Sequence, residues 1–134
     1  MIPKRPIHTV MSRQIHSVPT GSTVQTAVQL MSEKDIGSLL IQKDDQYIGI
    51  ITETDMVKKI MAKGLDQKTT LVDDVMSFPV YTIDENEFLN TANEQMGEQK
   101  IRHLLVTSRE KPVGILSVRN LLDAVYEWSV RLRI

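Results

Sequence analysis

The sequence contains no cysteine, which excludes disulfide frameworks and thiolate metal sites. No apolar run approaches the ~20 residues that a membrane-spanning helix requires, and the first residues include no apolar stretch long enough for a secretory signal. The formal net charge is only -1, so electrostatics gives no argument for nucleic acid or an anionic membrane as a partner. We therefore expect a cytoplasmic protein that binds neither.

Residues typical of catalytic and metal sites are also scarce. The three histidines, His8, His16 and His103, show no metal-ligand spacing, and no glycine-rich phosphate loop occurs. The acidic pairs Asp44-Asp45 and Asp73-Asp74 fall in predicted turns and linkers, where solvation accounts for them. We expect no enzymatic activity, no metal site and no required cofactor.

The chain does contain a tandem repeat at a fixed offset of 65 residues, as from Val10 to Val75. The matched segments are mostly apolar or small, which indicates a shared core: Val10-Met11-Ser12 with Val75-Met76-Ser77, Thr26-Ala27 with Thr91-Ala92, Met31 with Met96, Ile36-x-x-Leu39-Leu40 with Ile101-x-x-Leu104-Leu105, and Gly49-Ile50 with Gly114-Ile115. Such regularity predicts two stacked supersecondary units. One repeat alone would bury only about 60% of its unfolded surface, so the two are expected to stabilise one another.

Hydrophobic periodicity predicts the same order, β-α-β-β-α, in both repeats. The predicted fold class is therefore α+β, with two-layer units related by a pseudo-two-fold axis. In the first repeat, Ser22 is expected to cap the first helix, with Gln25 completing a capping box. The predicted segments are a lead-in at 1–8, repeat 1 at 9–62, a linker at 63–70, repeat 2 at 71–127 and a tail at 128–134, in one compact module. Trp128 in the tail is expected to pack on a dimer partner or on the lead-in.

These motifs resemble a tandem pair of CBS domains, often called a Bateman module. The strongest signature is Gly49-Ile50-Ile51-Thr52-Glu53-Thr54-Asp55, whose counterpart in the second repeat is Gly114-Ile115-Leu116-Ser117-Val118-Arg119-Asn120. The resemblance covers roughly residues 9–125. It implies a regulatory module that binds adenosine-containing ligands in clefts between the two units and associates face to face as a dimer.

The sequence Thr52-x-x-Asp55 lies where a strand is expected to enter a helix. The Asp55 carboxylate would accept two hydrogen bonds from a ribose diol, much as an acidic residue does in dinucleotide-binding folds. The same spacing also predicts a capping box, and Ser117-x-x-Asn120 would cap its own helix in the same way. Spacing alone leaves both interpretations open, whereas the resemblance favours ligand binding at Asp55.

The resemblance also indicates which cations would hold a phosphate. They come partly from the partner repeat, and the matching positions here are Arg102, His103 and Arg119. One predicted ligand site therefore combines Thr52, Asp55, Tyr81, Arg102, His103 and Arg119. A second, weaker site would combine His16, Gly37, Ser38, Thr54, Ser117 and Asn120, without a carboxylate or the cations. Each of these three residues also has an alternative interpretation that involves no ligand. Arg102 and Arg119 would face solvent, and His103 would have a structural role.

The main hypothesis is a sensor that binds AMP, ADP or ATP as a regulatory ligand and signals through rearrangement of a homodimer to an unknown regulated protein. One alternative is a constitutive dimerisation or interaction module with vestigial clefts. Another is a sensor of a different adenosyl ligand, such as S-adenosylmethionine or NAD(H). The Arg102, His103 and Arg119 set favours a phosphorylated ligand over a sulfonium.

Overall fold

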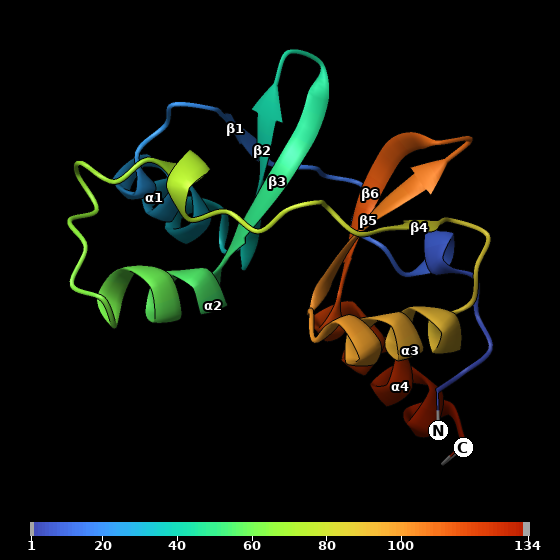
Figure 1. The fold of residues 1–134 in the computed structure, drawn as a ribbon. Helices are drawn as coiled ribbons and strands as arrows, with labels where there is room; N and C mark the ends of the chain where they lie inside the picture. Colours follow the sequence, from blue (N-terminus) through green and yellow to red (C-terminus); the bar gives the residue numbers. More distant parts are fainter. Residues whose placement is uncertain (1, 133–134) are drawn as a thin grey trace. The chain divides into compact units, whose positions relative to one another are not determined.

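The computed structural model describes residues 2–132, which form two compact units, one of them built from two separate stretches of the chain (Figure 1). The first-repeat unit comprises His16–Val80. The second-repeat unit comprises the described residues of Met1–Ile15 and Tyr81–Ile134. Residues 9–15, placed with the first repeat by the sequence pattern, therefore pack in the second-repeat unit, and residues 71–80 pack in the first-repeat unit.

The first-repeat unit consists of a three-stranded sheet and its helices. Its elements are β1 (Ser17–Pro19), α1 (Val24–Lys34), β2 (Ser38–Lys43), β3 (Gln46–Thr52), α2 (Glu53–Asp55), the π-helical turn η2 (Met56–Met61) and the 3-10 turn η3 (Val72–Asp74). The strand order is β1-β2-β3. β1 runs parallel to β2, and β2 pairs antiparallel with β3, so the chain crosses through α1 between the parallel strands.

The second-repeat unit repeats this topology. Its elements are η1 (Ile7–Thr9, a 3-10 turn), β4 (Thr82–Asp84), α3 (Leu89–Gln99), β5 (His103–Ser108), β6 (Lys111–Ser117) and α4 (Val118–Leu132). The β4-β5-β6 sheet has the same strand directions as its counterpart. Even the register shifts coincide, between Ile41 and Gln42 in one hairpin and between Val106 and Thr107 in the other. The predicted α+β class with two repeated units is confirmed.

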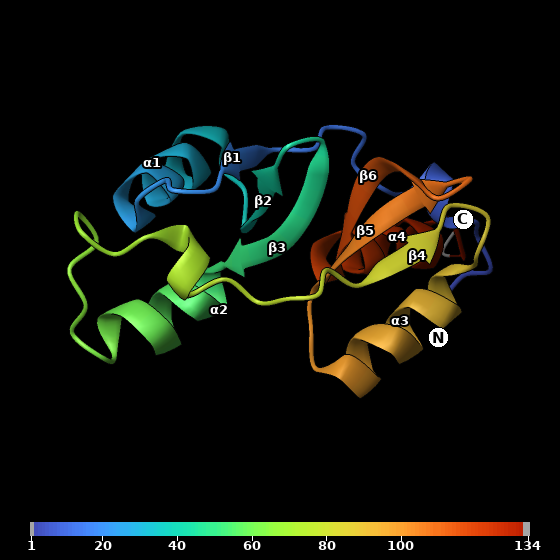
Figure 2. The same ribbon diagram turned by 45° about the horizontal axis from the view of Figure 1, so that its top comes forward.

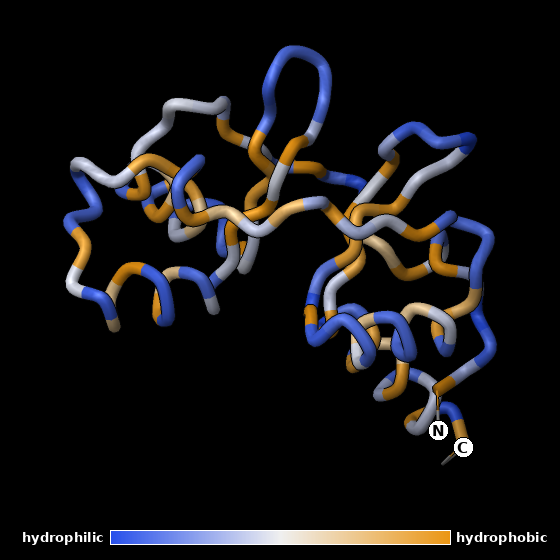
Figure 3. The backbone as a smooth tube through the Cα atoms, viewed as in Figure 1, coloured by the Kyte–Doolittle hydropathy of each residue, from blue (hydrophilic) through white to orange (hydrophobic). Residues whose placement is uncertain are grey.

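Each sheet buries one face under its helices. Figures 1 and 2 show α3 and α4 on the same side of the β4-β5-β6 sheet. The core of the second-repeat unit includes Ile7, Met11, Leu89, Met96, Leu104, Leu116 and Leu121, and that of the first-repeat unit includes Val24, Met31, Leu39, Ile41, Ile51, Ile60 and Val72. Figure 3 shows apolar strands that lead to hydrophilic hairpin tips. The central strands β2 and β5 each bury three consecutive residues, and the polar residues gather at the hairpin turns.

The start of α1 differs from the prediction by one residue. Thr23, not Ser22, is the N-cap, and its hydroxyl oxygen accepts a hydrogen bond from the Thr26 amide at 3.2 Å. The Ser22 hydroxyl donates instead to the Pro19 carbonyl at 2.7 Å. Ser22 therefore stabilises the turn that follows β1, and Thr23 caps the helix instead. Serine and threonine are both common N-cap residues.

A close backbone approach docks one methionine segment onto each sheet. In the first-repeat unit, Ser77 pairs with Ile50 on β3, and a Cβ at Gly49 would collide with the Met76 side chain. In the second-repeat unit, Ser12 pairs with Ile115 on β6. A Cβ at Gly114 would lie 2.5 Å from the Ser12 carbonyl oxygen. Both glycines are therefore required by the same packing.

The last helix continues beyond its predicted end near Trp128. α4 extends to Leu132, and Trp128 lines a pocket together with Pro3, Lys4 and Arg5 of the lead-in. Trp128 thus lies beside the lead-in, one of the two partners expected for it. Among the helices formed by residues 2–132, none has the combination of length and apolar character needed to cross a membrane.

Candidate functional site: the strand-to-helix junctions

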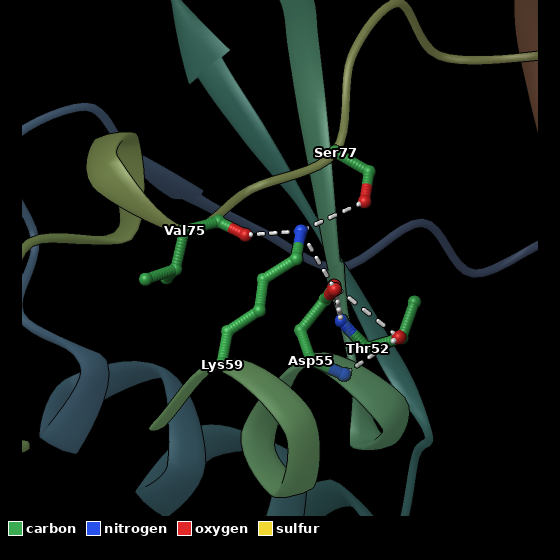
Figure 4. Close-up of polar contacts among 5 residues, drawn as sticks. All are labelled: Thr52, Asp55, Lys59, Val75 and Ser77. Carbon is green, nitrogen blue, oxygen red and sulfur yellow. Dashed lines mark hydrogen bonds and ion pairs between the residues drawn. The ribbon is translucent and has the colours of Figure 1, made fainter. Parts of the chain in front are cut away.

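The candidate site of the first-repeat unit begins where β3 leads into α2. Thr52 is the N-cap, with extended backbone dihedral angles. Its hydroxyl oxygen accepts a hydrogen bond from the Asp55 amide at 3.4 Å, and its own amide donates to Asp55 Oδ2 at 2.9 Å. These reciprocal bonds form a capping box. The Thr52 hydroxyl also donates to Asp55 Oδ2, at 3.3 Å, so this oxygen has two donors from one residue (Figure 4).

The second carboxylate oxygen faces a lysine one turn further along. Lys59 Nζ lies 3.0 Å from Asp55 Oδ1, and the same ammonium donates to the Val75 carbonyl at 2.9 Å and to the Ser77 hydroxyl at 3.3 Å. An ammonium has three N–H donors, and these three acceptors match them (Figure 4). Lys59 therefore joins the start of the helix to the segment docked on β3.

Asp55 is the one buried polar or charged residue among residues 2–132, with an exposed fraction of 6%. Burying an ionised carboxylate is costly unless it is paired and hydrogen-bonded. Here Thr52 and Lys59 supply both kinds of contact. The Lys59 side chain is 36% exposed, so water screens the pair and its net stabilisation is smaller than in a dry core.

The corresponding junction of the second-repeat unit preserves the cap without the charges. Asn120 Oδ1 accepts from the Ser117 amide at 2.8 Å and from the Ser117 hydroxyl at 3.0 Å, while the Asn120 amide donates to Ser117 Oγ at 3.3 Å. The position that matches Lys59, at the repeat offset of 65 residues, is Ala124, which is buried in the core. Carboxylate and lysine are thus both replaced by neutral residues.

The three predicted cations all belong to the second-repeat unit. Arg102 precedes β5 and is exposed, and its carbonyl accepts a hydrogen bond from the Val118 amide at 2.9 Å. His103 begins β5 and pairs with Ser117 in the ladder. Arg119 is exposed in the first turn of α4. The structure therefore gathers these residues around the β6–α4 junction of one unit.

Tyr81 lies just before β4 in the same unit. Its carbonyl accepts a hydrogen bond from the Leu105 amide at 3.0 Å, and its side chain is exposed. The predicted first set thus comes from both units, with Thr52 and Asp55 in the first-repeat unit and Tyr81 and the cations in the second.

The weaker predicted set is likewise divided. Ser117 and Asn120 are in the second-repeat unit, whereas His16, Gly37, Ser38 and Thr54 are in the first-repeat unit. The backbone contacts mirror those of the first set: the His16 carbonyl accepts from Leu40, and the Gly37 carbonyl accepts from Glu53. Ser38 pairs with Thr52 in the ladder.

Lys59 is the polar residue of the junction that the sequence reasoning missed. A signal was present, because Asp55 and Lys59 are four residues apart and such residues are neighbours on a helix. Its contact with Val75 and Ser77, by contrast, depends on packing between distant segments. Within residues 2–132, no cluster of three or more His, Asp or Glu side chains is arranged to hold a metal ion.

Comparison with known proteins identifies the repeats. The CBS-domain family model matches residues 7–62 and 72–127, which together make up most of the chain. The chain belongs to the CBS-domain family. It is 38% identical over 111 residues to the uncharacterized protein MK0525 of Methanopyrus kandleri, a match that covers 79% of this chain and 57% of that protein. The chain therefore spans little more than half of that relative.

Two further proteins are similar to this chain over most of its length. Hypoxic response protein 1 of Mycobacterium tuberculosis is 32% identical over 122 residues, covering 90% of this chain and 85% of that protein. A hexameric CBS-CP12 protein from bloom-forming cyanobacteria is 28% identical, with a TM-score of 0.82 and coverage of 88% of this chain and 69% of that one. CBS-domain pairs are generally regulatory or signalling modules.

Proposed function

We propose that this CBS-domain pair is a regulatory module that binds an adenine nucleotide, AMP, ADP or ATP. The observation that carries the proposal is the burial of Asp55, the sole buried charged residue among residues 2–132, at the junction where the family resemblance places a ribose-binding carboxylate. A fold stabilised by apolar packing does not need this charge, because the other repeat forms the same cap with Asn120. A buried charge that the fold does not need favours a binding role for Asp55.

In this proposal the two repeats contact different parts of the nucleotide. Asp55 accepts the ribose diol, and the Thr52 hydroxyl contributes a further polar contact. Arg102, His103 and Arg119 hold the phosphate, and the backbone near Tyr81 faces the base. The set of His16, Gly37, Ser38, Thr54, Ser117 and Asn120 binds weakly or not at all, because a neutral amide gives about half the hydrogen-bond strength of a carboxylate.

The signal would arise from differential affinity. A ligand shifts an equilibrium only if it binds one arrangement more tightly than another. We propose that the arrangements are two states of a homodimer, and that a regulated protein recognises one of them. Self-association is supported by the hexameric CBS-CP12 neighbour and by apolar residues exposed at matched repeat positions, Val57 with Leu122 and Met61 with Tyr126.

A thermal-shift panel of AMP, ADP, ATP, NADH and S-adenosylmethionine tests the proposal. A ligand at 100 times its Kd adds about 2.7 kcal/mol to the free energy of unfolding, which raises Tm by several degrees. Asp55→Asn should abolish the shift and retain the cap, as Asn120 does in the other repeat. Glu53→Gln is the matched control, because it removes one carboxylate from the same helix at an exposed position.

The same panel separates the alternatives. A shift only with S-adenosylmethionine or NADH would assign a different adenosyl ligand. No shift with any compound would favour a constitutive interaction module. The exposed Met61 and Tyr126 side chains support that alternative. In that case Tyr126→Glu should convert an oligomer to a smaller species in sedimentation, because a charge there opposes apolar association.

A further inference from the structure

Lys59 is the cation closest to the proposed ribose site, and the proposed function assigns no role to it. Its ammonium lies 3.0 Å from Asp55 Oδ1, the oxygen that Thr52 does not contact. A ribose diol that binds a carboxylate through two hydrogen bonds needs lone pairs of the same group. Asp55 Oδ2 already accepts two hydrogen bonds from Thr52, so a diol would approach Oδ1, the oxygen that Lys59 contacts.

Docking of the methionine segment does not by itself require Lys59. In the second-repeat unit, the Ser12 amide and carbonyl bond Ile115 at 2.9 Å each, and the matching helix position is Ala124. In the first-repeat unit, the equivalent bonds between Ser77 and Ile50 are 2.8 and 3.0 Å. The backbone hydrogen bonds of the two segments have similar lengths with and without a lysine, so the lysine accompanies the carboxylate rather than the segment.

We infer that Lys59 is the built-in counterion of Asp55, and that a ligand at Asp55 competes with it. In the absence of ligand, Lys59 fixes the orientation of the buried Asp55 carboxylate and compensates its negative charge. Competition for Asp55 Oδ1 loosens an ammonium that also holds the Val75 carbonyl and the Ser77 hydroxyl. This second part rests on the proposed function. It makes Lys59 a positioning residue that connects ligand occupancy to the segment preceding Tyr81, where the other unit begins.

The pairing itself is tested without any ligand. Lys59→Ala should lower Tm by several degrees, because it leaves a buried carboxylate uncompensated. Adding Asp55→Asn to it should raise Tm again, since the double variant reproduces the Asn120 and Ala124 pair of the other repeat. Lys58→Ala, an exposed neighbour, controls for loss of one positive charge and should change Tm little. A double variant no more stable than Lys59→Ala would overturn the pairing.

Competition is tested by acetylation of lysine amines, with AMP as the probe and mass spectrometry as the readout. Without AMP, Lys59 should react severalfold more slowly than Lys58, because its ammonium is held by three acceptors. Saturating AMP should raise the Lys59 rate severalfold and leave Lys58 unchanged. Binding of AMP in the thermal-shift assay with no change at Lys59 would overturn the competition and leave the proposed function intact. If AMP produces no shift but ADP or ATP does, the acetylation is done with that nucleotide instead. If none of the three produces a shift, the proposed function and the competition both fail, and the Tm comparison still decides the pairing.

Discussion

The two strand-to-helix junctions have nearly the same geometry and different charges. Asp55 and Asn120 each accept two hydrogen bonds from the hydroxyl residue three positions earlier, at 2.8–3.3 Å. Only the first-repeat junction has a carboxylate, and only there does a lysine contact the docked segment. Both junctions therefore form the cap, and the first-repeat junction adds an ion pair to it. This charged pair is the part that the two junctions do not share.

The helices after the junctions differ as well. α4 is a continuous α-helix of 15 residues, whereas α2 passes into the π-helical turn η2 directly after Asp55. The Ala62 amide bonds the Val57 carbonyl at 2.9 Å, a five-residue separation. π-helical turns are rare and occur frequently at functional sites. The irregular helix thus coincides with the repeat that bears the charged pair.

The largest expected effect concerns the glycines that dock the two segments. Gly114→Ala should cost about 3 kcal/mol, because its Cβ would meet the Ser12 backbone carbonyl at 2.5 Å. Gly49→Ala should cost about 1 kcal/mol, because the nearest obstacle is the flexible Met76 side chain and the Ser77 carbonyl oxygen is further away, at 3.2 Å. Urea unfolding of the two variants measures the difference. Equal losses in the free energy of unfolding would show that the two docked segments accommodate an added Cβ to the same extent.

A smaller effect is expected from moving the charged pair to the second repeat. Asn120→Asp alone should cost about 2 kcal/mol, because the half-buried carboxylate lacks a cation. Adding Ala124→Lys should recover part of that loss if the lysine reaches the Val10 carbonyl and Ser12 as Lys59 reaches Val75 and Ser77. Chemical denaturation of the single and double variants decides this. A double variant less stable than Asn120→Asp would show that the core around Ala124 excludes the lysine.

The smallest effect should come from the caps, where the two junctions are most alike. Thr52→Ala and Ser117→Ala should each cost about 1 kcal/mol, the usual loss when an N-cap hydroxyl is removed. Ligand response is expected to separate them: Thr52→Ala should reduce the AMP-dependent rise in Tm, and Ser117→Ala should leave it unchanged. Similar reduction in both variants would indicate that the second junction also contacts the ligand.

Much of each unit was predictable from local patterns. Apolar strand segments, helical periodicity and the offset of 65 residues predicted both hairpins and the repeated order, because these depend on contacts within a strand pair or a helical turn. Spacing alone left Thr52 and Asp55 open to two interpretations, a capping box and a ligand site, and the structure forms the capping box. The one-residue displacement of the α1 cap from Ser22 to Thr23 arose because two adjacent residues satisfy the same local rule.

The sequence by itself determined the two repeats, their strands and helices, and the difference between Asp55 and Asn120. Tertiary structure decided which segment packs with which repeat. Met11 and Met76 have matching neighbours, Val-Met-Ser, and the glycines that receive them are equivalent, so no local pattern distinguishes one pairing from the other. In the structure, Met11 packs at Gly114 and Met76 at Gly49. That long-range choice also brings Val75 and Ser77 to Lys59 and completes the polar network around the buried carboxylate.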